Sequence, residues 1–189
     1  MVSSRAVYLA FLALIGAERI FELWLSRRNA ARAFGRGGRE HGRGHFPLIA
    51  GTQAAFLASC AIESGVRAFP GALGWFALAA ALGAQALRYW AIASLGDRWN
   101  VRIIVVPGDT PVQRGPYRWV RHPNYLAVAL EIVAVPLVYG CWITAVVFAA
   151  VYAVLLRVRI RAEEAALGER WERAFAGRPR FLPGGGGHA

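Results

Sequence analysis

Long apolar runs along the chain alternate with short segments in which charged residues are concentrated. Five such runs cover approximately residues 7–25, 46–66, 75–95, 125–139 and 141–156. Pro136 and Gly140 interrupt the last stretch, which is too long for one crossing, and this predicts a tight helical hairpin. Its two arms would be roughly 22–24 Å long, short of a hydrocarbon core of about 30 Å. The pattern predicts an all-α integral membrane protein with a bundle of five transmembrane helices.

The distribution of charge predicts the orientation of these segments. The chain combines 57% hydrophobic residues with a formal net charge of +11. Most arginines lie in residues 26–45, 98–121 and 157–180, whereas the opposite side holds only Arg5 and Arg67. Because basic loops stay in the cytoplasm, we expect the N-terminus outside and the C-terminus inside, with a charged cytoplasmic helix after the last span. A soluble nucleic-acid binder would be less apolar, so no nucleic-acid partner is expected.

The length of the chain suits one domain, which we assign to residues 1–183, followed by a flexible Gly-rich tail at 184–189. The first apolar run could also be a cleaved signal peptide, since it has a short basic start. However, Glu18, Arg19 and Glu22 interrupt that run, and no small-residue cleavage site precedes them. We therefore expect this segment to remain as the first span.

The richest stretch for chemistry is residues 114–126, RGPYRWVRHPNYL, which forms a loop entering the fourth span. Gly115–Pro116 signals a turn, and Pro123 suits the first turn of a helix. The arginines and aromatic rings around this turn suit an anionic or ring-bearing ligand. The alternative is an ordinary membrane interface, where arginine and tyrosine are common.

A second charged stretch, residues 157–173, leaves the fifth span as a helix. Arg159 and Glu163 are four residues apart and share one helix face, with Glu164 beside them. A solvated helix with many ion pairs explains the same pattern without a site.

Charged side chains also occur inside the predicted spans, where they should face the bundle interior, a partner or a water-filled cavity. Arg88 in the third span could pair with Glu22 or Glu131, and the sequence leaves both open. The cysteines and histidines do not form a pattern that predicts a metal site. Cys60 and Cys141 fit small apolar packing residues, and His41 and His45 lie in a glycine-rich segment without a third ligand.

Residues 115–125, GPYRWVRHPNY, resemble the hallmark turn of the isoprenylcysteine carboxyl methyltransferase family. About forty residues later that family has R-x-x-x-E-E, a leucine, aromatic positions and a closing R-F-x-P. The corresponding residues here are Arg159, Glu163, Glu164, Leu167, Trp171, Phe175 and the segment 180–183. The two motifs cover about the last 75 residues of the chain.

The resemblance implies a transmembrane bundle without a Rossmann sheet, which binds S-adenosylmethionine in a pocket open to the cytosol and methylates a lipophilic or prenylated acceptor that enters from the membrane lipid. Arg159 or Arg88 would orient an anionic acceptor, and His122 or a glutamate such as Glu163 would act as base. The residues that would line the cofactor site are Gly115, Pro116, Tyr117, Arg121, His122, Pro123, Tyr125, Glu163 and Glu164.

One departure from the family pattern bears on the acceptor. Asp109 stands where the eukaryotic members have a histidine, six residues before the glycine. The upstream sequence is more similar to a bacterial subgroup that is associated with type III polyketide synthases and methylates alkylpyrones or alkylresorcinols. Two alternatives share features of the chain: NADPH-dependent membrane sterol reductases, which have the R-H-P-N-Y turn, and a non-catalytic membrane protein that keeps the fold.

Overall fold

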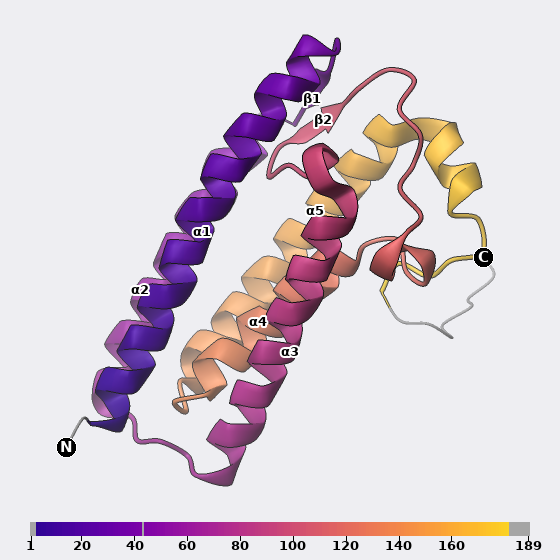
Figure 1. Ribbon diagram of the computed structural model, residues 1–189. Helices are drawn as coiled ribbons and strands as arrows, with labels where there is room; N and C mark the ends of the chain where they lie inside the picture. Colours follow the sequence, from indigo (N-terminus) through magenta and orange to yellow (C-terminus); the bar gives the residue numbers. More distant parts are fainter. Residues whose placement is uncertain (1–2, 43, 182–189) are drawn as a thin grey trace.

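Five helices make up most of the computed structural model, which describes residues 3–42 and 44–181 (Figure 1). Two three-residue strands and three short 3₁₀ helices connect them. In chain order the elements are α1 (Ser4–Gly35), β1 (Arg39–His41), α2 (His45–Glu63), η1 (Ser64–Val66), α3 (Ala72–Leu95), η2 (Gly96–Arg98), β2 (Ile103–Val105), η3 (Gly115–Arg118), α4 (Pro123–Leu137) and α5 (Trp142–Ala174).

The helices fit a membrane environment. The segments Phe46–Val66, Ala72–Arg98 and Trp142–Ala174 are long and apolar enough to cross a bilayer. Their outer faces carry exposed large apolar side chains, among them Ile62, Phe76 and Val146. Exposing such an apolar surface to water is unfavourable, whereas contact with lipid tails is not. The chain is therefore a membrane protein with three helices suited to span the bilayer, and spans by α1 and by the shorter α4 stay predictions.

The predicted helical hairpin is confirmed. Helix α4 ends at Leu137, with Pro136 in its last turn, and α5 starts at Trp142. Gly140 lies between them with φ +69°, a backbone conformation that a residue with a side chain adopts only with strain. Glu63 at the end of α2 then caps the start of α5, because its carboxylate accepts hydrogen bonds from the Ile143 and Thr144 amides at 3.2 and 2.8 Å.

Two parts of the predicted architecture need correction. Helix α1 continues ten residues past the predicted end of the first span, through a segment that we expected to be a loop. The all-α prediction missed β1 and β2, which pair antiparallel with Glu40 opposite Ile104. The two-stranded sheet formed by β1 and β2 lies near the C-terminal end of α1 (Figure 1). A three-residue strand has no periodicity to reveal it, and its partner here is more than sixty residues away.

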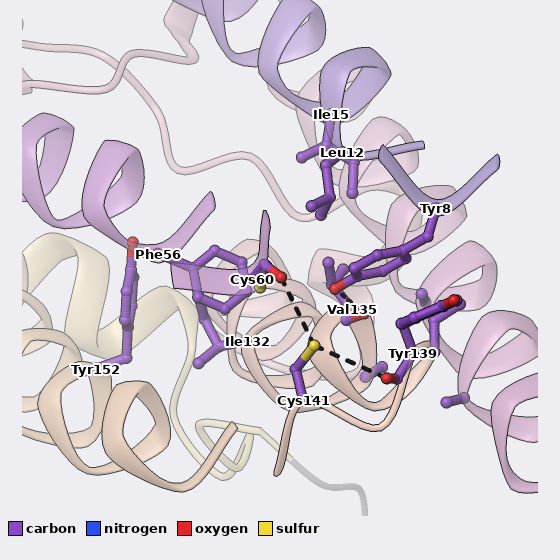
Figure 2. Close-up of a cluster of buried hydrophobic side chains, with 14 residues drawn as sticks. Tyr8, Leu12, Ile15, Phe56, Cys60, Ile132, Val135, Tyr139, Cys141 and Tyr152 are labelled. Carbon is purple, nitrogen blue, oxygen red and sulfur yellow. Dashed lines mark hydrogen bonds between the residues drawn. The ribbon is translucent and has the colours of Figure 1, made fainter. Parts of the chain in front are cut away.

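The main core lies where α1, α2, α3 and α4 meet the first part of α5 (Figure 2). Tyr8 stacks on Tyr139 with ring centroids 5.1 Å apart, and its hydroxyl donates to the Val135 carbonyl at 3.2 Å. Cys60 and Cys141 are fully buried free thiols within this cluster, as predicted. This core holds together the helix ends that lie far from the motif loop. The residues of the two charged motifs gather at the opposite end of the bundle.

Candidate functional site

Gly115 seats the motif loop directly against α3. It has φ +59°, and a Cβ atom placed on it would lie 2.0 Å from the Ser94 hydroxyl oxygen. Arg114 reinforces the same contact, since its Nε donates to the Ser94 carbonyl at 2.9 Å. Gly115 therefore permits a close approach of the loop backbone to the Ser94 and Trp90 side chains of α3, which a residue with a Cβ would block.

The C-terminal segment pairs with the motif loop through its backbone. The amide of Arg121 donates to the Pro179 carbonyl at 3.0 Å, and that of His122 donates to the Arg180 carbonyl at 3.1 Å. The Nε of Arg121 also donates to the carbonyl of Arg178 at 2.6 Å. These hydrogen bonds join residues more than fifty positions apart, so the C-terminal segment and the motif loop form one structural unit.

Side chains from both motifs form a polar network around His122. Its Nε2 lies 3.0 Å from a Glu164 carboxylate oxygen, and Arg180 pairs with the same carboxylate at 2.7 Å. The hydrogen bond to Glu164 raises the pKa of the Arg180 guanidinium. Glu164 is consequently a structural link between His122 and the C-terminal segment.

A second polar network lies one helical turn further along α4, at Tyr125. The Tyr125 hydroxyl donates to Glu163, and its oxygen accepts from the Arg159 Nε at 2.8 Å. Another nitrogen of Arg159 donates to the Val101 carbonyl, in the loop before β2. This chain of contacts fixes the relative positions of α4, α5 and that loop.

These networks surround a cavity of about 450 Å³. All four predicted catalytic residues line it, namely Arg88, His122, Arg159 and Glu163. So do three further predicted cofactor residues, Tyr117, Arg121 and Tyr125. Burial and the nearby Glu163 carboxylate raise the pKa of Tyr117 well above the ordinary value for tyrosine, so this side chain stays neutral.

Four predicted cofactor residues, all in the described part of the chain, are absent from the cavity wall: Gly115, Pro116, Pro123 and Glu164. Gly115 contacts α3 instead, Pro123 begins α4, and Glu164 is occupied by His122 and Arg180. These positions suit residues that hold the cavity wall in place rather than contact a ligand.

An aromatic wall closes one side of the cavity. The rings of His122 and Trp171 have centroids 5.4 Å apart, and those of Trp171 and Phe175 are 4.8 Å apart. The Arg121 guanidinium lies 6.0 Å from the centre of the Trp171 ring. Ring faces next to a carboxylate suit a ligand that is planar in one part and cationic in another.

Asn124 is a cavity residue that the sequence reasoning missed. Asn124 lines the cavity, and its Oδ1 is buried without a hydrogen-bond partner among the described residues. Buried polar atoms are nearly always paired, which makes Asn124 a candidate to contact a ligand. No signal in a single sequence distinguishes this position from its neighbours.

Arg88 pairs with both of the glutamates that the sequence left open. Its Nε and Nη2 donate to the two Glu22 oxygens at 2.6 and 2.7 Å, and its Nη1 lies 3.6 Å from Glu131. Arg19 lies on the same two carboxylates at 3.4 and 3.7 Å. These side chains face the interior of the bundle, as expected of charges inside a membrane.

Comparisons with known proteins agree with this geometry. The model of the isoprenylcysteine carboxyl methyltransferase family matches residues 76–169, which include the motif turn and the Glu163–Glu164 pair. An uncharacterized protein of Bacillus subtilis, YpbQ, is 40% identical over 159 residues, covering 84% of this chain and 95% of its own. An uncharacterized protein of Haemophilus influenzae is 28% identical over 157 residues, covering 82% and 91%.

The matched family implies a methyltransferase of the membrane and does not favour the reductase alternative. Its motifs occur here in the expected order, and the fold places them around one cavity. This chain belongs to the isoprenylcysteine carboxyl methyltransferase family.

Proposed function

We propose that the chain transfers a methyl group from S-adenosylmethionine to an oxygen atom of a lipophilic acceptor, at the cytoplasmic side of the membrane. The observation that carries this proposal is the single cavity to which both family motifs contribute side chains. The N-terminus lies outside and the C-terminus in the cytoplasm, in keeping with the arginine-rich segments on the side of the motif loop.

The residues in the cavity wall fit the proposed cofactor. A volume of about 450 Å³ lies within the range of small-molecule sites, roughly 300–1,000 Å³. Arg121 can bind a carboxylate, Glu163 an ammonium group, and Trp171 the face of an adenine ring. The unpaired Oδ1 of Asn124 can accept a hydrogen bond from a hydroxyl or amine.

When bound, S-adenosylmethionine supplies a methyl group on a cationic sulfur. The protein must position the acceptor oxygen and keep water away from it. A carboxylate acceptor needs no base, whereas a hydroxyl acceptor must lose a proton. His122 is suited to take that proton, because its Nε2 is hydrogen-bonded to Glu164, which leaves Nδ1 as the proton acceptor.

The acceptor is a carboxylate of the prenylcysteine type or the hydroxyl of a long-chain alkylpyrone or alkylresorcinol. Apolar side chains from three helices line the inner part of the cavity, including Ile49, Val128 and Leu155. They suit the part of an amphiphile next to its polar head.

The direct test is methyl transfer from labelled S-adenosylmethionine by the purified full chain, with a prenylcysteine analogue and an alkylpyrone offered separately. Base-labile label on the first acceptor identifies a methyl ester, and base-stable label on the second an ether. No transfer to either, together with no binding of S-adenosylhomocysteine in calorimetry, would refute the proposal.

Variants test the placement of the cofactor. Glu163→Ala and His122→Ala should each weaken binding of S-adenosylhomocysteine at least about tenfold, because each removes a polar group from the cavity wall. Glu169→Ala is the matched control, since Glu169 lies in α5 just past its break at Gly168 and its side chain is 89% exposed. Unchanged affinity in both cavity variants contradicts the assignment.

A further inference from the structure

Two residues of the motif turn lie on its outer surface. Tyr117 and Arg121 line the cavity, whereas Arg118 and Trp119, which lie between them in the chain, are exposed and are not part of its described wall. Methyl transfer in the cavity therefore leaves the outer face of this turn without a role. The surroundings of Arg118 and Trp119 show what that face could bind.

Arg118 and Trp119 form a surface cluster with Trp90 of α3. The guanidinium carbon of Arg118 lies 4.1 Å from the centre of the Trp119 ring. The rings of Trp119 and Trp90 have centroids 5.5 Å apart and meet edge to face, and each of these two residues is 45% exposed. These three side chains, the Trp90 cluster, present one positive charge beside two half-exposed indole rings.

The Trp90 cluster lies at the depth expected of a membrane boundary. Helix α3 extends about 27 Å from Ala72 to Trp90, close to the hydrocarbon thickness of about 30 Å. Trp75, near the other end of the same helix, is also exposed. Tryptophan is enriched at both membrane–water interfaces, where its ring lies among the lipid headgroups. Trp90 and Trp75 thus mark the two boundaries, and Arg118 lies at the level of the lipid phosphates.

The guanidinium of Arg118 is free to bind an anion at this level. Its neighbours Arg114 and Arg121 each donate from Nε to a backbone carbonyl, at 2.9 and 2.6 Å. Arg118 has no carboxylate or carbonyl partner among the described residues, and its one given contact is with the Trp119 ring. The chain has no acidic residue between Asp109 and Glu131 to neutralise it. An unneutralised guanidinium beside interfacial rings matches the phosphate and glycerol region of an anionic lipid.

We propose that the Trp90 cluster binds the phosphate group of an anionic phospholipid, and that the bound lipid holds η3 in position. Arg118 is the last residue of η3, next to Tyr117, which lines the cavity. A lipid bound to the outer face of η3 therefore restricts the cavity wall on its inner face. Lipid binding and cofactor binding then strengthen each other. This coupling rests on the proposed function, whereas the lipid site does not.

Native mass spectrometry of the purified full chain measures the lipid site directly. The protein in detergent is mixed with equal amounts of phosphatidylglycerol and phosphatidylcholine that have the same acyl chains. Phosphatidylglycerol should be retained about fivefold more than phosphatidylcholine, as expected for one arginine at an anionic lipid surface. Excess inorganic phosphate should not displace it, because free phosphate has no acyl chains to pack at the interface. Equal retention of the two lipids, or displacement by phosphate, overturns the proposal.

Arg118→Gln should reduce retention of phosphatidylglycerol to that of phosphatidylcholine. The matched control is Arg173→Gln, which removes the same charge from a side chain that is 79% exposed and already lies 4.0 Å from the Glu169 carboxylate. This control should retain phosphatidylglycerol as the unaltered protein does. A preference that persists in Arg118→Gln, or that is lost equally in both variants, contradicts the lipid site.

The coupling is tested by S-adenosylhomocysteine affinity in lipid nanodiscs. The unaltered protein should bind about fivefold more tightly in nanodiscs containing phosphatidylglycerol than in phosphatidylcholine alone, and Arg118→Gln should lose only this difference. S-adenosylhomocysteine carries one carboxylate and one ammonium group, so the charge of the membrane surface does not concentrate it. Equal affinity of the unaltered protein in both nanodiscs refutes the coupling. Retention of phosphatidylglycerol without any binding of S-adenosylhomocysteine would instead refute the proposed function and support the lipid site.

Discussion

Replacing Gly115 by alanine should disturb the seat of the motif loop on α3. The new Cβ would lie 2.0 Å from the Ser94 hydroxyl oxygen and 3.1 Å from the indole nitrogen of Trp90. The Ser94 hydroxyl cannot move aside without cost, because it donates to the Trp90 carbonyl at 2.7 Å. The loop must therefore shift away from α3 or the helix must deform.

Two terms set the size of the effect on the free energy of unfolding. Alanine at φ +59° costs about 1–2 kcal/mol relative to glycine, since its Cβ approaches the following carbonyl. Forcing an extra carbon into a packed contact costs about 1–3 kcal/mol. Together they predict that Gly115→Ala loses about 2–5 kcal/mol of stability.

Gly177→Ala separates these two terms. Gly177 has φ +75°, but a Cβ there would meet no atom within 4 Å, so only the backbone cost of about 1–2 kcal/mol remains. Adding Ser94→Gly to Gly115→Ala removes both the hydroxyl and the Cβ that clash, and should restore part of the loss.

The assay is unfolding of the purified full chain in one detergent, followed by tryptophan fluorescence as denaturant is added. S-adenosylhomocysteine binding, measured in the same samples, should fall in Gly115→Ala because the loop bearing Tyr117 and Arg121 moves. Equal losses of stability in the Gly115 and Gly177 variants, or no recovery on adding Ser94→Gly, would refute the close-contact explanation.

Four further changes have definite expected outcomes. Glu63→Ala should cost about 1–2 kcal/mol in the same unfolding assay, because the first amides of α5 lose their cap, and an unchanged curve contradicts this. Asn124→Leu should leave stability within about 1 kcal/mol and weaken S-adenosylhomocysteine binding, since it removes an acceptor that has no protein partner; reduced stability with unchanged affinity argues against a ligand contact. Glu164→Gln should lower kcat about tenfold or more with a hydroxyl acceptor and spare a carboxylate acceptor, because only the first needs His122 as base; equal losses contradict that role. A reporter enzyme fused to the C-terminus should be active only in the cytoplasm, and activity outside would reverse the proposed orientation.

Most residues of the candidate site could be predicted from the sequence, but their individual roles could not. Gly115, Tyr117 and Arg121 lie within one short motif, so a single resemblance marked them all. Their roles depend on which way each faces: Gly115 meets α3, whereas Tyr117 and Arg121 line the cavity. That difference arises from the path of the loop over α3, which no local pattern records.

The sequence by itself determined the helices, the hairpin at Pro136 and Gly140, and the membrane setting, because each of these follows from apolar length or from turn chemistry within a few residues. Tertiary structure alone decided the rest. It brought Glu22 to Arg88 across 66 residues, paired β1 with β2, and laid the C-terminal segment on the motif loop. Such contacts depend on how whole helices pack, and a buried charge can choose its partner only after packing has brought the candidates together.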